Sequence, residues 1–297
     1  MSLFMHIVDR LFNEVELFRQ KKDALGRLSL SPLQKCTAAI RVLAYGIAPD
    51  AVDEYNRLSS TTTRSCVEHF VEGIIYLFGD EYLRRPTPAD LRRLLDISEH
   101  HGFLGMIRNI DSKPTIVLKA VDSYDLWIWH TFFGPPATLN DINVLDRSPV
   151  FDDIIKGQAP QVTFYVNGRK YHLAYYLTDG IYPKWATLIQ SIPIPHGPKV
   201  VIFAQHQEVV RKDVERAFGV LQARFAIVKN PALVWDKVKI RKIMKECIIL
   251  HNSRNERDGY TQFDVSEFQE RENNESSHVD LTYSTDIPTN IANMMGV

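Results

Sequence analysis

The chain has 297 residues, of which 45% are hydrophobic and 24% charged, a composition typical of globular domains. Its formal net charge is -1, so the chain as a whole is not a basic nucleic-acid binder and any such binding requires a local basic patch. Its three cysteines are far apart and form no Cys-x-x-Cys, which argues against a disulfide framework or a zinc site and fits a reducing compartment.

The first hundred residues predict helices. Residues 1–22 carry apolar residues at helical spacing with acids between them, which is not the pattern of a secretory signal. Further helices are predicted over 32–47, 48–58 and 59–79, the last opened by a Ser/Thr cluster. A short helix, a turn and a longer helix with a polar start match the helix-turn-helix pattern, and a plain helical bundle is the alternative.

The pattern changes after Gly102, where three β-rich runs follow one another. They cover 103–111, 113–123 and 125–134, with turn signals between them, and predict antiparallel strands. No window of the chain holds an apolar run long enough for a membrane helix. We therefore expect an intracellular, soluble protein with no membrane association.

The second half of the chain predicts a helix, a hairpin, a strand and two more helices. A helix is predicted from Asn140 to about residue 155, after a loop. Asn167-Gly168 between β-rich arms is a strong hairpin signal, and the following strand is predicted to end at Asp179. The last two helices are predicted over 204–228 and 234–252. The first of them carries an apolar stripe at helical spacing, with Glu215 at its edge, formed by Val214, Phe218, Leu221 and Phe225.

This order of elements predicts an α/β or α+β fold. The predicted domains are a helical, helix-turn-helix-like domain at 1–100, a domain with a sheet and flanking helices at 101–252, and a polar, disordered tail at 253–297.

Four carboxylates stand at the boundaries of predicted elements: Asp111, Asp141, Asp179 and Glu215. Strand ends converge at one edge of a sheet, and a helix packed on that sheet can supply a further acid. Gathered carboxylates repel one another unless a cation is present, and Mg²⁺ or Mn²⁺ prefers oxygen ligands. Two such ions can bind both oxygens of an in-line phosphoryl displacement.

Each acid also has an ordinary structural interpretation. Asp141 is suited to a helix N-cap, and Asp179 precedes a Gly-Ile-Tyr-Pro turn. Glu215 could pair with Arg211 or Arg216 on the helix surface.

Several segments resemble a known family. They are "LWIWHTFFG", "NDINVL", "YYLTDGIYPKWATLI", "VERAFGVLQARFAIV" and "IMKECIILHN", and the resemblance runs from about residue 30 to 252. The chain is similar to the plant Harbinger (PIF-type) transposases of the DDE superfamily of endonucleases.

The resemblance implies an RNase H-like mixed sheet with flanking helices and metal-dependent hydrolysis and strand transfer of DNA phosphodiesters. It places the family's catalytic acids on Asp111, Asp179 and Glu215, and its metal ligands on these three and Asp141. It also implies Mg²⁺ or Mn²⁺ as cofactor, DNA as partner, action in the nucleus and a Myb-like DNA-binding partner protein.

The chain departs from the family after Asp111, where "RNID" is followed directly by Ser-Lys-Pro-Thr. A segment that family members carry there is missing, so the end of the first strand and its turn are expected to be lost. This departure favours the alternative of a domesticated, catalytically silent module that binds DNA or protein.

Other residues have weaker functional interpretations. Expected DNA contacts are Thr62, Thr63 and Arg64 at the start of a helix, and Arg211 and Lys212 on another. The basic run at 237–245 either contacts phosphates or is a solvated helix face. We expect His206 at the surface, and Trp127, Trp129 and His251 to be packed residues.

Overall fold

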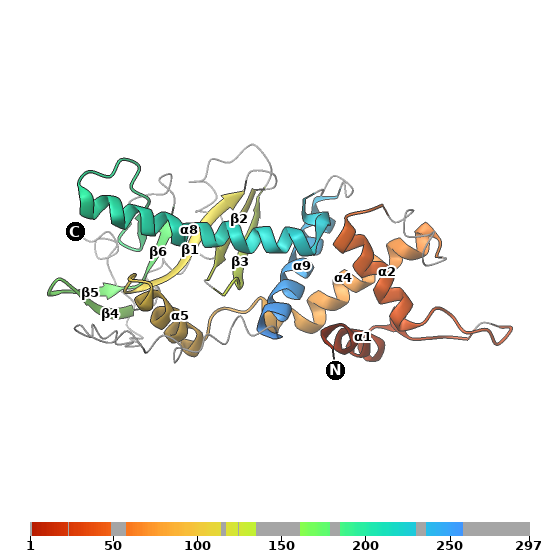
Figure 1. The fold of residues 1–297 in the computed structure, drawn as a ribbon. Coiled ribbons are helices and arrows are strands. Elements are labelled where there is room, and N and C mark those ends of the chain that lie inside the picture. The colour runs from red at the N-terminus through yellow and green to blue at the C-terminus, as the bar shows by residue number, and fades with distance from the viewer. Residues whose placement is uncertain are drawn as a thin grey trace. The chain divides into compact units, whose positions relative to one another are not determined.

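The computed structural model describes residues 2–22, 24–48, 58–113, 117–123, 125–134, 161–178, 185–229 and 236–257 (Figure 1). These residues form two compact units. The first, the helical unit, combines Met1–Arg84 with Phe218–Tyr260, and the second, the α/β unit, contains the described part of Arg85–Ala217. Both helices and a partly parallel sheet are present, which confirms a mixed α/β fold. The contiguous domains predicted from the sequence stay a prediction.

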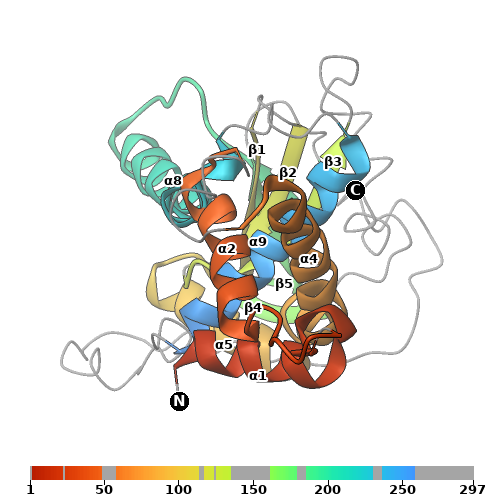
Figure 2. The ribbon, with the colours of Figure 1, turned by 90° about the vertical axis from the view of Figure 1, so that its right-hand side faces the viewer.

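In its described residues, the helical unit is built from four helices and two short 3-10 turns, together with the end of a fifth helix. Figure 2 shows α2, α4 and α9 side by side. The elements are α1 (Leu3–Glu14), η1 (Glu16–Phe18), α2 (Pro32–Tyr45), α4 (Ser60–Tyr82), the last residues of α8 (Pro198–Arg224), η3 (Ala226–Val228) and α9 (Lys237–Arg257).

The predicted helix over 32–47 is confirmed, because local signals fix both of its ends. At its start, Ser31 and Gln34 form a capping box in which each side chain bonds the other's backbone N–H, and Pro32 occupies the first turn. At its end, Gly46 adopts a left-handed conformation with φ 60°. A side chain at Gly46 would also collide with the backbone of Ala226.

The third predicted helix is also confirmed and runs from Ser60 to Tyr82, with Ser59 as its N-cap. Gly73 of this helix lies against α1, where a Cβ atom would come within 2.5 Å of Leu11. The absence of a side chain at Gly73 therefore lets α1 and α4 approach closely. Most of the predicted helix over 48–58 lies outside the described residues, and so the helix-turn-helix motif stays a prediction.

A buried polar network joins the end of α8 to α9. The Arg224 guanidinium donates to Oδ1 of Asn255 at 2.8 Å and to the backbone oxygen of His251 at 3.3 Å. Its Nη1 also lies 3.2 Å from Nδ1 of His251, and the Asn255 amide nitrogen lies 3.0 Å from the other ring nitrogen. His251 is fully buried, which confirms it as a packed residue. Asn252 extends the network by donating to the backbone oxygen of Tyr82.

Glu246 on α9 is a fully buried carboxyl group in the helical unit. The Cys247 thiol lies 3.5 Å from its Oε2, and its Oε1 has no hydrogen-bond partner among the described residues. Burial raises the pKa of Glu246 from 4.5 to about 8, because the charged form would lose its hydration. The residue is therefore protonated at neutral pH.

Replacing Glu246 with Gln is expected to remove a pH dependence of stability. At pH values between 4.5 and about 8 the folded protein keeps the Glu246 proton, whereas the unfolded chain loses it. The contribution of the protonated Glu246 to the free energy of unfolding is therefore complete below pH 4.5 and is lost as pH rises through about 8. Between these values the free energy of unfolding of the wild type should fall by about 1.4 kcal/mol per pH unit relative to Glu246→Gln. Urea titrations across this range measure the difference, and parallel curves would contradict the burial of an ionisable group here.

The α/β unit is centred on a five-stranded mixed sheet with strand order β3-β2-β1-β6-β7. Strands β1, β2 and β3 form an antiparallel meander, which confirms the three predicted successive strands, whereas β6 and β7 run parallel to β1. The unit contains α5 (Pro88–His100), β1 (Met106–Lys113), β2 (Val117–Asp122), β3 (Ile128–Gly134), β4 (Gln161–Val166), β5 (Arg169–Leu173), β6 (Tyr175–Thr178) and β7 (Leu188–Gln190). The first twenty residues of α8 complete it.

The turn between β2 and β3 is held by a buried acid. The Asp125 carboxylate accepts hydrogen bonds from the Ser123 hydroxyl and from the Trp127 backbone N–H, and it pairs with Arg93 of α5 at 2.6 Å. The side chain of Asp125 is fully buried, and that of Arg93 is one-quarter exposed. Trp127 and Trp129 are both buried beside it, as predicted. This cluster fixes α5 against the meander.

Asp125→Ala is expected to destabilise the α/β unit by about 3 kcal/mol, because it removes the buried partner of Arg93 and the oxygen that accepts two hydrogen bonds of the turn. Chemical denaturation measures the change. Asp80→Ala, which removes an exposed carboxylate, is the matched control and should change stability by less than about 0.5 kcal/mol. Equal effects of the two substitutions would contradict a structural role for Asp125.

Candidate functional site

Asp111 lies on β1, the strand at the centre of the mixed sheet. The antiparallel ladder with β2 pairs Asp111 with Ala120 and continues to Lys113, opposite Leu118. The expectation that the end of this strand is lost is therefore wrong: the chain stays in the ladder for two residues beyond Asp111. Backbone pairing with β2 holds this end of β1 in place without the missing family segment.

On its other side, β1 pairs in parallel with β6. The register sets Arg108 opposite Tyr176 and Asn109 opposite Leu177. Strand β6 ends at Thr178, which is fully buried and whose hydroxyl has no hydrogen-bond partner among the described residues. Asp179 follows Thr178 in the sequence. Both Asp179 and Asp141 lie outside the described residues, together with the helix predicted from Asn140.

Glu215 lies on α8, which begins at Pro198 and not at residue 204 as predicted. The predicted apolar stripe is buried at Phe218, Leu221 and Phe225, and Glu215 is 43% exposed beside it. This confirms that the carboxylate stands at the border of the buried face. One of its oxygens lies 4.0 Å from Arg211, the pairing expected in the structural interpretation.

Arg211 has a second, closer acid on the same helix. Its guanidinium makes a two-pronged contact with Glu208, at 2.9 and 2.7 Å. This hydrogen bonding holds the pKa of Glu208 below its ordinary value. Glu208, Arg211 and Glu215 thus form a row of alternating charge along α8, in which Glu208 makes the stronger contact with the arginine.

Contacts within the α/β unit fix the first part of α8. The buried Gln207 donates its amide to the backbone oxygen of Gln190, the last residue of β7, at 2.9 Å. Phe203 packs against Phe103, which lies between α5 and β1, with ring centroids 5.8 Å apart. Strand β7 is hydrogen-bonded to β6, so a side-chain contact ties the helix that carries Glu215 to the parallel half of the sheet.

Within the described part of the chain, no three His, Cys, Asp or Glu side chains gather into a group that could hold a metal ion. Of the four predicted ligands, only Glu215 has a described side chain, since Asp111 is described by its backbone and the other two are not described. The metal site therefore stays a prediction.

The expected DNA contacts at the start of α4 fall in different environments. Thr63 is fully buried, so its side chain is not available to DNA, and this prediction is corrected for that residue. Thr62 lies at the helix cap, where its backbone N–H and hydroxyl contact Ser59. Arg64 and, on α8, Lys212 are exposed, and they remain candidates for DNA contact. His206 is exposed as predicted.

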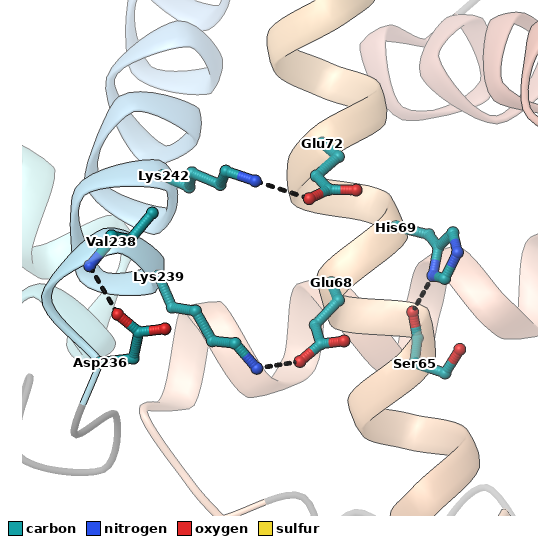
Figure 3. Close-up of polar contacts among 8 residues, drawn as sticks. All are labelled: Ser65, Glu68, His69, Glu72, Asp236, Val238, Lys239 and Lys242. Atoms are coloured by element: carbon teal, nitrogen blue, oxygen red, sulfur yellow. Dashed lines mark hydrogen bonds and ion pairs between the residues drawn. The ribbon is translucent and has the colours of Figure 1, made fainter.

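The basic run at 237–245 is partly neutralised within the helical unit. Figure 3 shows Lys239 and Lys242 of α9 reaching Glu68 and Glu72 of α4. The Lys242 pair is 2.7 Å long, and its hydrogen bond holds the pKa of Glu72 below its ordinary value. These two lysines connect helices and do not form the phosphate-binding face that the sequence allowed.

The buried Asp125 is an acid that the sequence interpretation did not single out. The signal that could have found it is the segment "SYDLWIW", in which a lone acid precedes alternating tryptophans and leaves a strand at a turn. Its bonds to Ser123 and Arg93 give it a structural role in the α/β unit.

None of the helices in the described ranges is long and apolar enough to cross a membrane. The family model described as plant transposon protein matches residues 108–261, just over half of the chain. The match covers the mixed sheet from β1 onward, α8 and α9, and the positions of all four predicted acids. The chain belongs to this family of plant transposon proteins. No curated protein and no solved structure matches the chain.

The contact between Arg211 and Glu208 predicts a titration shift. In Arg211→Gln, the pKa of Glu208 should rise toward its ordinary value, because its main hydrogen-bond donor is removed. Carbon-detected NMR of the carboxyl groups measures this shift directly. Lys212→Gln is the matched control and should move the same pKa less, since Lys212 acts on Glu208 only at longer range. An unchanged Glu208 titration in Arg211→Gln would contradict the charge row on α8.

Proposed function

We propose that this protein is a transposase-derived nuclease of the Harbinger type, with an RNase H-like α/β domain that hydrolyses or transfers DNA strands. Asp111, Asp179 and Glu215 are the catalytic acids of this proposal, and Asp141 is a further metal ligand. The family match over residues 108–261 supports the transposase origin. The mixed sheet, with a meander on one side of β1 and parallel strands on the other, supports the fold.

The observation that carries the proposal is the parallel register of β1 and β6. Asn109 pairs with Leu177, and the two acids are each two residues farther along their chains, at Asp111 and Asp179. Neighbouring strands lie only about 4.8 Å apart, and parallel strands bring equivalent positions to the same level of the sheet. The register thus brings Asp111 of β1 close to the level of Thr178, the last residue of β6, which directly precedes Asp179 in the sequence, and this supports a shared metal site.

The exposure and the contacts of Glu215 support its role as the third metal ligand. Its carboxylate is partly exposed, and the helix is fixed to β7 through Gln207, about 12 Å away along the helix axis. Arg211 binds Glu208 through two short hydrogen bonds but lies 4.0 Å from Glu215. The contact to Glu215 is therefore the weaker one, and a cation could displace it without breaking the pair with Glu208.

The donor set fits a hard divalent cation, because all four side chains are carboxylates. Mg²⁺ or Mn²⁺ bound there supplies activation of a water or a 3′-hydroxyl and stabilisation of the leaving oxygen. The carboxylates of Asp111 on β1 and of Asp179 after β6 would hold the metal ions that bind the reacting phosphate. Glu215 would complete the site from α8. Nuclear action on DNA, with a Myb-like partner protein supplying target choice, belongs to the same proposal.

A second function, a catalytically silent module that binds DNA or protein, is favoured by one observation. Glu215 already has a cationic neighbour in Arg211, as a purely structural surface acid would. In such a protein the row of charges on α8 would stabilise the helix and no metal would bind. The two functions therefore differ in whether divalent cations bind to the acids.

Metal binding separates the two functions. Calorimetry of the wild type with Mn²⁺ should show binding, and Asp179→Asn and Glu215→Gln should each weaken it at least about tenfold, because each removes a charged ligand. Cleavage of a duplex in Mg²⁺ should be lost in both variants.

Glu14→Gln is the matched control, since it removes an exposed carboxylate of α1 and should leave metal binding unchanged. A folded wild type that binds no divalent cation would overturn the nuclease and favour the silent module. Equal weakening by Glu14→Gln would show that the metal binds nonspecifically to surface acids.

A further inference from the structure

The β4–β5 hairpin is an exposed basic and aromatic ribbon separate from the main sheet (Figure 1). Its two strands are joined at Asn167-Gly168, where both residues have positive φ, 50° and 75°, as a two-residue hairpin turn requires. The predicted hairpin is therefore confirmed. The stretch 161–173 contains Arg169, Lys170 and His172 and no Asp or Glu.

One face of the hairpin is packed against the α/β unit. Val162 and Phe164 are buried, and the Phe164 ring lies directly over Gly105, ahead of β1. A Cβ atom at Gly105 would come within 2.2 Å of this ring, so only glycine fits there. The ring of Tyr171 stacks on Phe164 from the paired strand, with centroids 5.3 Å apart. The base of the hairpin is thus anchored, and its register is fixed.

The other face of the hairpin points away from this anchor. Because side chains alternate along a strand, Tyr165, Lys170 and His172 share the face opposite Phe164 and Tyr171. Tyr165 and Lys170 are directly paired across the strands, and Tyr165 is 50% exposed. Arg169 is exposed beside the turn.

The cations of the hairpin differ from several other basic side chains, which are held in ion pairs. Arg169 and Lys170 have no ion-pair partner among the described residues, whereas Lys239, Lys242 and Arg211 each contact a carboxylate. In a chain with a net charge of -1, two unpaired cations on a short ribbon without acids make a local positive patch. Such a patch is complementary to a polyanion.

We propose that the outer face and tip of the β4–β5 hairpin bind the phosphate backbone of double-stranded DNA. A two-stranded ribbon fits the major groove, and Lys and Arg side chains neutralise phosphates while hydroxyls such as that of Tyr165 donate hydrogen bonds to them. The hairpin leads through Ala174 directly into β6, so bound DNA would lie next to the strand that precedes Asp179. The choice of DNA as partner rests on the proposed function, but the binding requires no metal and no cleavage.

The test is anisotropy of a short fluorescein-labelled duplex, titrated with the full chain in EDTA at several salt concentrations. Arg169→Gln/Lys170→Gln should weaken binding roughly tenfold at low salt and reduce the slope of log affinity against log salt by about 2, one counterion for each lost phosphate contact. Lys22→Gln/Lys229→Gln removes the same charge from exposed positions in the helical unit and should leave the slope unchanged. Circular dichroism and melting curves confirm that both variants are folded.

Three results would overturn this inference: a wild type that binds no duplex, equal salt slopes in the wild type and the hairpin variant, or equal losses in the two double variants. Polyglutamate that competes as well as unlabelled duplex would also overturn it, in favour of an acidic protein partner.

Binding to the duplex should exceed binding to one of its strands alone, and the reverse order would contradict the groove contact. Because these titrations contain EDTA, a failure of the nuclease proposal leaves their outcome unchanged.

Discussion

The parallel pairing of β1 with β6 is the constraint on which the α/β unit depends. Strand β1 is bonded on one edge to the antiparallel meander and on the other to β6, so it joins two parts of the chain that are far apart in sequence. The hairpin β4–β5 is anchored at Gly105, where the chain enters β1, and it leads directly into β6. A shift of the β1–β6 register by one residue would move both the hairpin and the segment carrying Asp179 relative to Asp111.

Charge is distributed unevenly in a nearly neutral chain, with some cations held in ion pairs and others exposed on the β4–β5 hairpin. On α9 the lysines reach across to α4, and on α8 Arg211 is held by Glu208, so both groups are engaged in pairs between or along helices. Such partly exposed pairs contribute little stability individually, and they leave little free charge for a ligand. The hairpin has cations without acids, and Glu215 stands beside the buried stripe of α8 at 4.0 Å from Arg211, farther from it than Glu208 at 2.7 Å.

Local signals in the sequence were sufficient for much of the fold. The Ser/Thr cluster before α4, the Asn167-Gly168 turn and the β-rich runs after Gly102 each act within a few residues, and the elements they predicted are present. The errors concern contacts between distant segments. Nothing near Thr63 shows that its side chain is buried, and nothing near Lys239 shows that Glu68, about 170 residues away, will neutralise it. The extension of β1 beyond Asp111 likewise depends on pairing with β2.

In the candidate site, too, local features were predictable from the sequence and side-chain contacts were not. The sequence isolated Glu215 at the border of a buried stripe, and the structure confirms that position, but the contacts of Arg211 with two acids depend on side-chain conformations that spacing alone does not determine. The sequence predicts "YVNGRKYHL" as a hairpin and assigns no role to its cations, so the proposal for them rests on the structure. Its lack of acids is visible in the sequence, whereas the burial of one face on Gly105 is visible only in three dimensions.

The central claim is that carboxylates from β1, from the end of β6 and from α8 share divalent cations. The most direct measurement is anomalous X-ray diffraction from crystals of the full chain grown with Mn²⁺. The account predicts an anomalous peak about 2.2 Å from carboxylate oxygens of Asp111 and Asp179, with Glu215 completing the site. Ordered carboxylates that point apart with no peak between them, at a Mn²⁺ concentration that saturates known two-metal sites, would contradict it.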